Sequence, residues 1–295
     1  MGNFFNASDG AKIHYVDMGR GPVLLYVHAF GENMEIKMPF FEPLAQHFRV
    51  ISFDQRGWGK TEIQGEMSLD RSAKDAKDLV EFLKPEEVYY VGYSMGAADL
   101  FAYVRLFGTQ YLRRIAIIDM TPCLINKDDW NHGLYQGQYT EEMYKNDLET
   151  MDRDFKEFNV YFFTETFLPN NASNKRDFTP TKEKYDNLLV MLKDMPGGAE
   201  AMLDLPERQR GVCKAYWISM CENDFRAVLP LIDKPTALIY ARPGSLYDEA
   251  TAEYIASKAQ KPSLYPVDGA THMVANTHAA EVLQKIIEFG KKIES

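Results

Sequence analysis

Short apolar runs and amphipathic stretches alternate along most of the chain. The runs that predict buried strands are 23–28, 50–54, 88–92, 115–119, 236–240 and 263–267, and a hairpin is expected around 11–18. The stretches between them predict helices over 35–47, 69–83, 95–107, 249–259 and 279–289, two of them with N-caps at Ser68 and Asp248. Apolar strands separated by helices are typical of a mostly parallel sheet covered by helices on both faces, so the sequence predicts an α/β fold.

One long interval interrupts this alternation. Residues 121–233 contain no convincing strand and are rich in Met, Phe and Tyr. Pro122 and Pro235 lie near its two ends, where the chain would leave the sheet and return to it. We expect a helical cap over 121–233, inserted into one α/β core domain made of residues 1–120 and 234–295.

A candidate nucleophile follows the strand predicted over 88–92. The sequence there is Gly92-Tyr93-Ser94-Met95-Gly96, and it opens the helix predicted over 95–107. A serine on a sharp strand-to-helix turn is presented to substrate, and glycines two positions away let strand and helix approach closely. The pattern favours Ser94 as a nucleophile over the alternative, a Gly-Ser turn without a chemical role.

A serine hydroxyl needs a neighbouring base to act as a nucleophile at neutral pH. Five of the six histidines lie in predicted strands, in or beside predicted helices, or in the insertion: His14, His28, His47, His132 and His278. His272 instead follows the last predicted strand, in Asp268-Gly269-Ala270-Thr271-His272, where a sheet of this winding brings a loop to the nucleophile. We therefore expect His272 to be the base, the alternative being an ordinary surface histidine.

An acyl-transfer site also needs two fixed N–H donors for the oxyanion. The residue after the nucleophile, Met95, is expected to supply one. The loop after the strand predicted over 23–28 is expected to supply the other, and Phe30 is the candidate. The alternative interpretation of that loop is a turn that buries an aromatic ring.

Four segments carry a resemblance to a known family. They are His28-Ala29-Phe30-Gly31, Asp54-Gln55-Arg56-Gly57-Trp58-Gly59-Lys60-Thr61, Gly92-Tyr93-Ser94-Met95-Gly96 and Gly269-Ala270-Thr271-His272. Together they resemble the α/β-hydrolase superfamily over nearly the whole chain. The resemblance implies that 28–31 is an oxyanion turn supported by His28, with Ala29 in place of the usual glycine. It also implies that 54–61 supports the fold and the oxyanion loop more than the chemistry.

The third catalytic residue departs from the usual pattern of that superfamily. Most members carry an acid after the strand before the last, but residues 241–247 contain no carboxylate here. Asp119 occupies the position used by a minority branch, which includes small esterases that often have a serine where Ser245 stands. The resemblance therefore implies that Asp119 orients His272 and that Ser245 is a supporting residue. Asp248 is better explained as the acid that begins a helix.

The resemblance implies hydrolysis of a carboxylic ester or a similar small acyl compound through an acyl-enzyme on Ser94. Serine rather than aspartate at this turn argues against the dehalogenases and epoxide hydrolases of the same superfamily. Two alternatives remain. One is a non-hydrolytic enzyme with the same fold, a lyase or a cofactor-free dioxygenase. The other is a small-molecule receptor with vestigial turnover.

Composition and net charge also limit which classes of binding partner we expect. The chain has 295 residues, a net charge of −10 and three widely spaced cysteines, with no His/Cys cluster at metal spacing. Acidic charge disfavours nucleic acid and anionic lipid surfaces as partners. No signal-peptide pattern and no run of 18 apolar residues is found, so we expect a cytoplasmic protein without a membrane anchor. The expected reaction implies no metal or organic cofactor. The sequence leaves the oligomeric state open.

Overall fold

The computed structural model describes residues 3–169, 176–193 and 198–292. Within these residues eight strands form one sheet in the order β1-β2-β4-β3-β5-β6-β7-β8. The strands are β1 (Asn3–Asn6), β2 (Lys12–Gly19), β3 (Val23–Val27), β4 (Arg49–Phe53), β5 (Val88–Tyr93), β6 (Leu112–Ile118), β7 (Pro235–Pro243) and β8 (Lys261–Ala270). Both β1 and β4 pair with β2 in the antiparallel sense, and the strands from β4 across to β8 are parallel.

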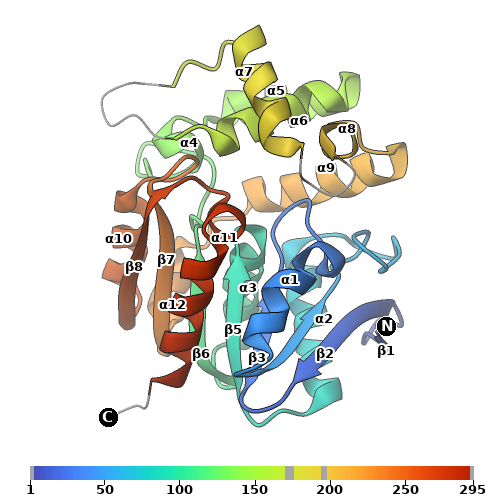
Figure 1. Cartoon of the computed structure of the whole chain (residues 1–295), viewed down its shortest axis with the longest axis vertical. Helices are drawn as coiled ribbons and strands as arrows, with labels where there is room; N and C mark the ends of the chain where they lie inside the picture. Colours follow the sequence, from blue (N-terminus) through green and yellow to red (C-terminus); the bar gives the residue numbers. More distant parts are fainter. Residues whose placement is uncertain (1–2, 170–175, 194–197, 293–295) are drawn as a thin grey trace.

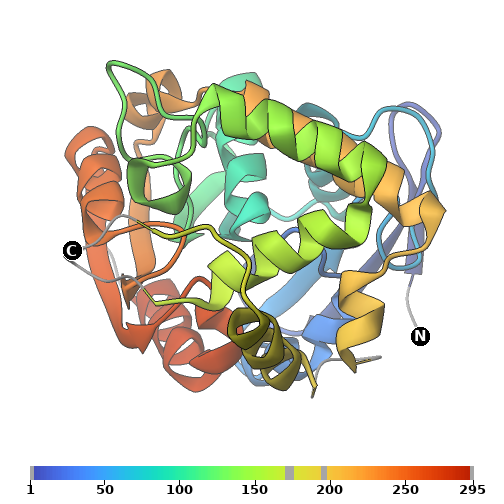
Figure 2. The same cartoon turned by 90° about the horizontal axis from the view of Figure 1, so that it is seen from above.

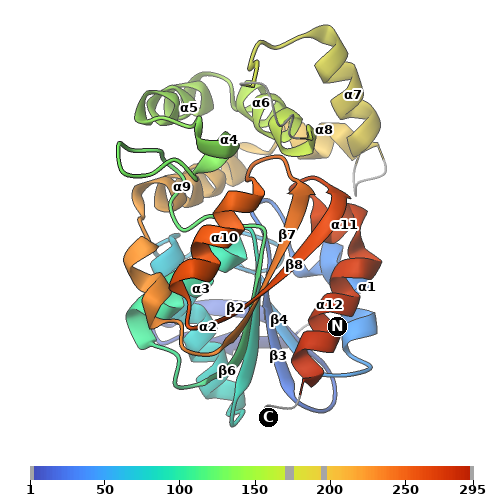
Figure 3. The same cartoon turned by 90° about the vertical axis from the view of Figure 1, so that its left-hand side faces the viewer.

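Helices cover both faces of this sheet. Figures 1 and 3 show α1 (Met34–Leu44) and α12 (Ala279–Lys291) on one face, and α2 (Leu69–Leu83), α3 (Met95–Phe107) and α10 (Glu249–Lys258) on the other. Successive side chains of a strand point to opposite faces. In β3, accordingly, Leu25 is buried in one apolar core, whereas Leu24 and Tyr26 are buried in the other. Burial on both faces explains why the central strands have continuous apolar sequences.

Most predicted elements are confirmed, and the helices over 69–83 and 95–107 have the predicted bounds. The hairpin expected around 11–18 is instead a single strand, β2, which pairs with the earlier strand β1. The side chain of Ser68 accepts a hydrogen bond from Arg71 N at 3.1 Å, and that of Asp248 accepts one from Thr251 N at 3.1 Å, so both predicted N-caps are confirmed. The first helix ends earlier than predicted, at Leu44, because the chain then tightens into a turn in which His47 N donates to the Leu44 carbonyl at 2.9 Å.

Helices also form the long segment between β6 and β7. In the described part of this segment they are α4 (Leu134–Gly137), α5 (Glu141–Arg153), α6 (Phe155–Phe167), α7 (Lys182–Leu192), α8 (Gly198–Leu203), α9 (Glu207–Glu222) and the 3₁₀ helix η1 (Arg226–Leu231). Figures 1 and 2 show α4–α8 above the edge of the sheet where the parallel strands end. None of the helices in the described ranges combines the length and the apolar composition that a membrane-spanning helix needs.

Candidate active site

Ser94 occupies a strained turn between β5 and α3. Its backbone has φ 51° and ψ −118°, a combination that L-residues rarely adopt. A Cβ atom on Gly92 would lie 2.4 Å from the Gly96 carbonyl oxygen, and one on Gly96 would lie 2.0 Å from the Val27 carbonyl oxygen. Both positions therefore need glycine, because strand and helix approach too closely for any side chain. The turn leaves the Ser94 side chain at the carboxyl end of the central strands.

The structure brings Ser94, His272 and Asp119 together at this edge. The Ser94 Oγ lies 2.9 Å from Nε2 of His272, and Nδ1 of His272 lies 2.7 Å from Oδ2 of Asp119. Asp119 directly follows β6, and its second oxygen accepts a hydrogen bond from Ala241 N at 3.0 Å. All three predicted site residues are buried, so their contacts are little screened by water. The arrangement can move a proton from the serine hydroxyl to the imidazole.

Ser245 and Asp248 lie on the segment after β7, but they have different surroundings. The Ser245 hydroxyl accepts a hydrogen bond from His272 N at 2.6 Å and donates one to the Thr166 carbonyl at 2.8 Å. The Asp248 carboxylate caps α10 through the N–H and hydroxyl of Thr251. The structure thus places Ser245 against the His272 loop and directs Asp248 to a helix end.

The turn after β3 is held by a buried histidine. His28 Nδ1 lies 2.9 Å from the Ala29 carbonyl oxygen, and Gln55 N donates to His28 Nε2 at 3.2 Å. Burial lowers the pKa of His28, so the ring is neutral, with Nδ1 as its donor. Within the described part of the chain, neither the Phe30 N–H nor the Met95 N–H has a hydrogen-bond acceptor, and both residues are close to Ser94 in the fold.

The segment 54–61 connects the elements that surround this turn. Asp54 accepts hydrogen bonds from Met34 N at 2.8 Å and from Lys60 N at 2.9 Å, and it pairs with His14 Nδ1 at 2.7 Å. These contacts tie β2, β4 and the start of α1 together. The geometry agrees with the structural role that the sequence predicts for the segment.

A buried ion pair next to the turn was not predicted. Lys37 Nζ lies 2.6 Å from Oε1 of Glu32 and donates to Asn276 Oδ1 at 3.2 Å, and Oε2 of Glu32 accepts from Ala29 N at 3.2 Å. Both side chains are almost fully removed from water. In the sequence, Glu32 and Lys37 look like ordinary charged residues at the start of an amphipathic helix. Only the fold shows that they are buried next to this turn.

Two tyrosines enclose His272. The Tyr93 hydroxyl donates to the His272 carbonyl oxygen at 2.7 Å, and the Tyr247 ring stands edge-on to the imidazole with centroids 5.6 Å apart. Burial raises the pKa of both phenols well above the usual range, so they remain protonated. Tyr93 is the variable residue of the Gly-x-Ser-x-Gly pattern, which explains why the motif did not single it out.

A cavity of about 40 Å³ adjoins Ser94. Its lining residues come from the turn after β3, from β5 and the Ser94 turn, from α6 and α8, and from the His272 loop: Ala29, Phe30, Gly31, Glu32, Tyr93, Ser94, Phe162, Phe163, Thr166, Met202, His272 and Met273. Ligand pockets usually measure about 300–1,000 Å³, so this space is small. Among the described residues, no three His, Cys, Asp or Glu side chains cluster as a metal site would require.

Comparisons with known proteins agree with this architecture. A provisionally named non-heme chloroperoxidase of Synechocystis sp. is 25% identical over 284 residues, covering 94% of each chain. The bifunctional esterase/perhydrolase DCH of Acinetobacter calcoaceticus is 22% identical, over 97% of this chain and 98% of its own. An esterase from Exiguobacterium antarcticum superposes with a TM-score of 0.78 at 20% identity, covering 99% of this chain and 100% of the esterase.

The family model for the alpha/beta hydrolase fold matches residues 22–279, which is most of the chain. That match, together with the eight-stranded sheet and the helices on both of its faces, confirms the fold predicted from the sequence. The chain belongs to the α/β-hydrolase family.

Proposed function

We propose that this protein is a serine hydrolase that cleaves a carboxylic ester, or a similar small acyl compound, through an acyl-enzyme on Ser94. One observation carries the proposal. The hydroxyl of Ser94, the imidazole of His272 and the carboxylate of Asp119 form an unbroken series of contacts at 2.9 and 2.7 Å in a buried site. This is the arrangement that makes a serine nucleophilic and returns the proton to a leaving group.

In the acylation step, Ser94 Oγ attacks the ester carbonyl carbon while His272 Nε2 takes its proton. The Asp119 carboxylate holds the tautomer with Nδ1–H and stabilises the imidazolium that forms. The N–H groups of Phe30 and Met95 would receive the negative charge on the carbonyl oxygen, because they have no acceptor in the described part of the chain. The tetrahedral intermediate then expels the alcohol, which leaves with the proton from His272.

In the deacylation step, a water molecule loses a proton to His272 and attacks the acyl carbon. The carboxylic acid then leaves and Ser94 recovers its proton. In both steps His28 and Ser245 would hold neighbouring groups in position and would not themselves react. His28 holds the Ala29 carbonyl beside the Phe30 donor, and Ser245 holds the backbone of His272.

We also propose that residues 121–233 act as a cap that sets acyl-chain selectivity. Phe162 and Phe163 of α6 and Met202 of α8 line the cavity beside Ser94. With only about 40 Å³ there, short acyl groups should fit without displacement of the aromatic side chains, and long ones should not. Phe162→Ala should therefore shift the preference among p-nitrophenyl esters toward longer chains.

A fluorophosphonate probe followed by intact-protein mass measurement tests the nucleophile. The parent protein should gain one adduct and hydrolyse p-nitrophenyl acetate. Ser94→Ala should not form the adduct, and its kcat should be lower by a factor of about 10⁶, as on removal of the triad nucleophile in subtilisin. Ser257→Ala removes an exposed serine of α10 and serves as the matched control, which should behave as the parent. Parental hydrolysis by folded Ser94→Ala would refute the proposal.

Perhydrolysis is a second candidate, because a relative at 22% identity is named for both esterase and perhydrolase activity. The two reactions share the acyl-enzyme and differ in the acceptor, water or hydrogen peroxide. A peroxide molecule is small enough for the cavity beside Ser94. Peracid formation from acetate esters and peroxide, lost in Ser94→Ala, would establish it. Oxygen uptake with a quinolone-type substrate in place of ester hydrolysis would instead indicate the dioxygenase alternative.

A further inference from the structure

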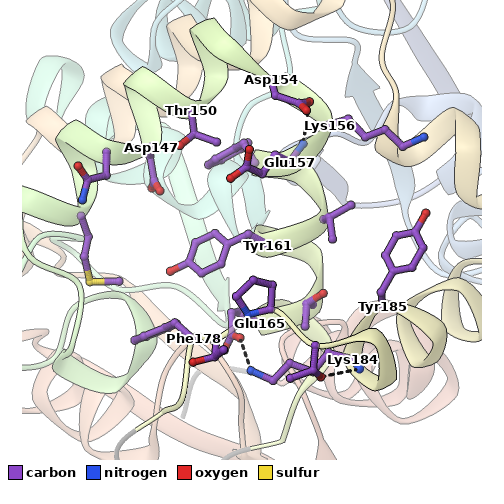
Figure 4. Close-up of a pocket in the computed structure, with 18 residues that line it drawn as sticks. Asp147, Thr150, Asp154, Lys156, Glu157, Tyr161, Glu165, Phe178, Lys184 and Tyr185 are labelled. Carbon is purple, nitrogen blue, oxygen red and sulfur yellow. Dashed lines mark hydrogen bonds and ion pairs between the residues drawn. The ribbon is translucent and has the colours of Figure 1, made fainter.

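A second and much larger cavity lies within the helices between β6 and β7. Its volume is about 520 Å³, and it is bounded by α5, α6 and the segment that leads into α7 (Figure 4). It shares no lining residue with the cavity beside Ser94. Helix α6 separates the two: Tyr161 and Glu165 line the large cavity, whereas Phe162 and Phe163 line the small one. The proposed ester hydrolysis gives this larger space no role.

A buried carboxylate belongs to the wall of this cavity. Asp147 of α5 is 7% exposed, and its Oδ2 accepts a hydrogen bond from the Tyr139 hydroxyl at 2.5 Å. Across residues 3–169, 176–193 and 198–292, no Lys, Arg or His forms an ion pair with it. Burial raises the pKa of Asp147 to about 7. A cation brought into the cavity would therefore stabilise the ionised carboxylate, which the protein itself leaves without a counter-charge.

The other charged groups of the wall either form ion pairs or are exposed to water. Glu165 pairs with Arg176 at 2.6 Å and with Lys184 at 3.7 Å. Lys156 pairs with Glu200 at 2.9 Å. Neither lysine is thus free to neutralise Asp147. Glu157 pairs with Arg153 at 3.0 Å, and the exposed Asp154 caps α6 through Glu157 N. Asp147 is therefore the buried carboxylate of the wall that is left without a counter-charge.

Aromatic rings line the same cavity. Figure 4 shows the Tyr161 ring and the Asp147 carboxylate on the same side of the cavity, with Phe178 nearby. The Tyr161 and Phe178 rings have centroids 5.9 Å apart, and both contact Tyr135 behind them, at 5.8 and 5.3 Å. Ring faces attract cations, and aromatic side chains form binding sites for organic ammonium ions.

We propose that this cavity binds a small organic ammonium ion with an apolar substituent, the ammonium group at Asp147 and the substituent against Tyr161 and Phe178. A volume of about 520 Å³ lies within the range of small-molecule sites. A metal ion would need further oxygen or nitrogen ligands, and the described residues supply no such cluster. The proposal does not depend on the ester hydrolysis proposed for Ser94.

Calorimetric titration with 2-phenylethylammonium tests this site. The neutral probe 2-phenylethanol has nearly the same shape, so the ratio of the two dissociation constants isolates the charge. The parent should bind the ammonium at least tenfold more tightly than the alcohol. Asp147→Asn should remove that preference, whereas Glu149→Gln should keep it, because Glu149 is an exposed carboxylate of the same helix outside the cavity wall. Affinity for the ammonium should rise between about pH 6 and 8 as Asp147 ionises.

Two further variants keep the test decisive if Asp147→Asn folds poorly. Phe178→Leu removes one ring from a half-buried position in a loop and should weaken ammonium binding about threefold or more. Ser94→Ala should bind the ammonium as the parent does, since it changes only the other cavity. Equal affinity of the parent for the two probes, or no binding up to about 10 mM, would overturn the proposal. Parental ammonium binding by folded Asp147→Asn, or its loss in Ser94→Ala, would do the same.

Discussion

The hydroxyl of Ser245 contacts the backbone N–H of His272 at 2.6 Å, although 27 residues separate the two. The same hydroxyl donates to the carbonyl of Thr166 in α6 at 2.8 Å. One buried side chain therefore joins the loop that carries the imidazole to the helix that lines the cavity beside Ser94. Displacement of that helix would therefore move the backbone of His272 through the Ser245 hydroxyl.

Ser245→Ala should leave the His272 N–H and the Thr166 carbonyl without a partner in a dry site. An unpaired buried polar group costs about 1–3 kcal/mol, so the free energy of unfolding in urea should fall by about that much. The loosened imidazole should lower kcat for p-nitrophenyl acetate by about tenfold, which corresponds to about 1.4 kcal/mol of lost positioning. A parental kcat in Ser245→Ala would show that this contact does not position His272.

Asp119→Asn should lower kcat by about 10⁴, as the corresponding change does in chymotrypsin-type proteases. With the Asn oxygen on Ala241 N, the NH2 group would face Nδ1 of His272 as a donor. The imidazole would then carry its proton on Nε2 and could not take the serine proton. The fold should persist, because an Asn side-chain oxygen can still accept the hydrogen bond from Ala241 N. Steady-state kinetics alongside thermal unfolding measures both effects.

The matched control is Asp248→Asn. Asparagine caps helices as well as aspartate does, so α10 should keep its N-cap and kcat should change less than twofold. A large loss of kcat in Asp248→Asn together with near-parental activity in Asp119→Asn would reverse the proposed assignment of the acid. That result would leave the roles proposed for Ser94 and His272 unchanged.

Lys37→Met should destabilise the protein strongly. It leaves the Glu32 carboxylate buried without its partner, and breaking a buried ion pair in this way costs about 3–5 kcal/mol. Adding Glu32→Gln removes the stranded charge, so the double variant should regain most of the lost unfolding free energy. Urea unfolding of the parent, the two single variants and the double variant measures the coupling. Additive effects of the two substitutions would contradict a direct interaction.

The pH dependence of stability should reveal Asp147. Burial raises its pKa to about 7, so between about pH 4 and pH 7 the folded state holds a proton that the unfolded state has lost. The free energy of unfolding should therefore fall as pH rises through that window, by a few kcal/mol relative to Asp147→Asn. The neighbouring phenols of Tyr135, Tyr139 and Tyr161 have raised pKa values and stay neutral throughout. A pH-independent difference between parent and Asp147→Asn would contradict this expectation.

Many elements of the fold could be predicted from residues that are close together in the sequence. The helix over 69–83 combines an apolar periodicity with a serine cap, and both depend on residues close together in the chain. The Ser94 turn was equally clear, because a strand, two glycines and a helix follow one another within a few residues. The edge strand Asn3–Asn6 was not predicted, since it is four residues long and only one of its side chains is buried.

Chain order and winding carried the prediction as far as His272, and the family resemblance suggested Asp119. The tertiary structure decided which carboxylate lies beside the imidazole, because that depends on how close the ends of β6, β7 and β8 come in the sheet. It alone revealed the Glu32–Lys37 pair and the cavity beside Asp147. Burial determines whether these charged groups need a partner or shift in pKa. That burial comes from helices and loops that are distant in sequence and meet only in the fold.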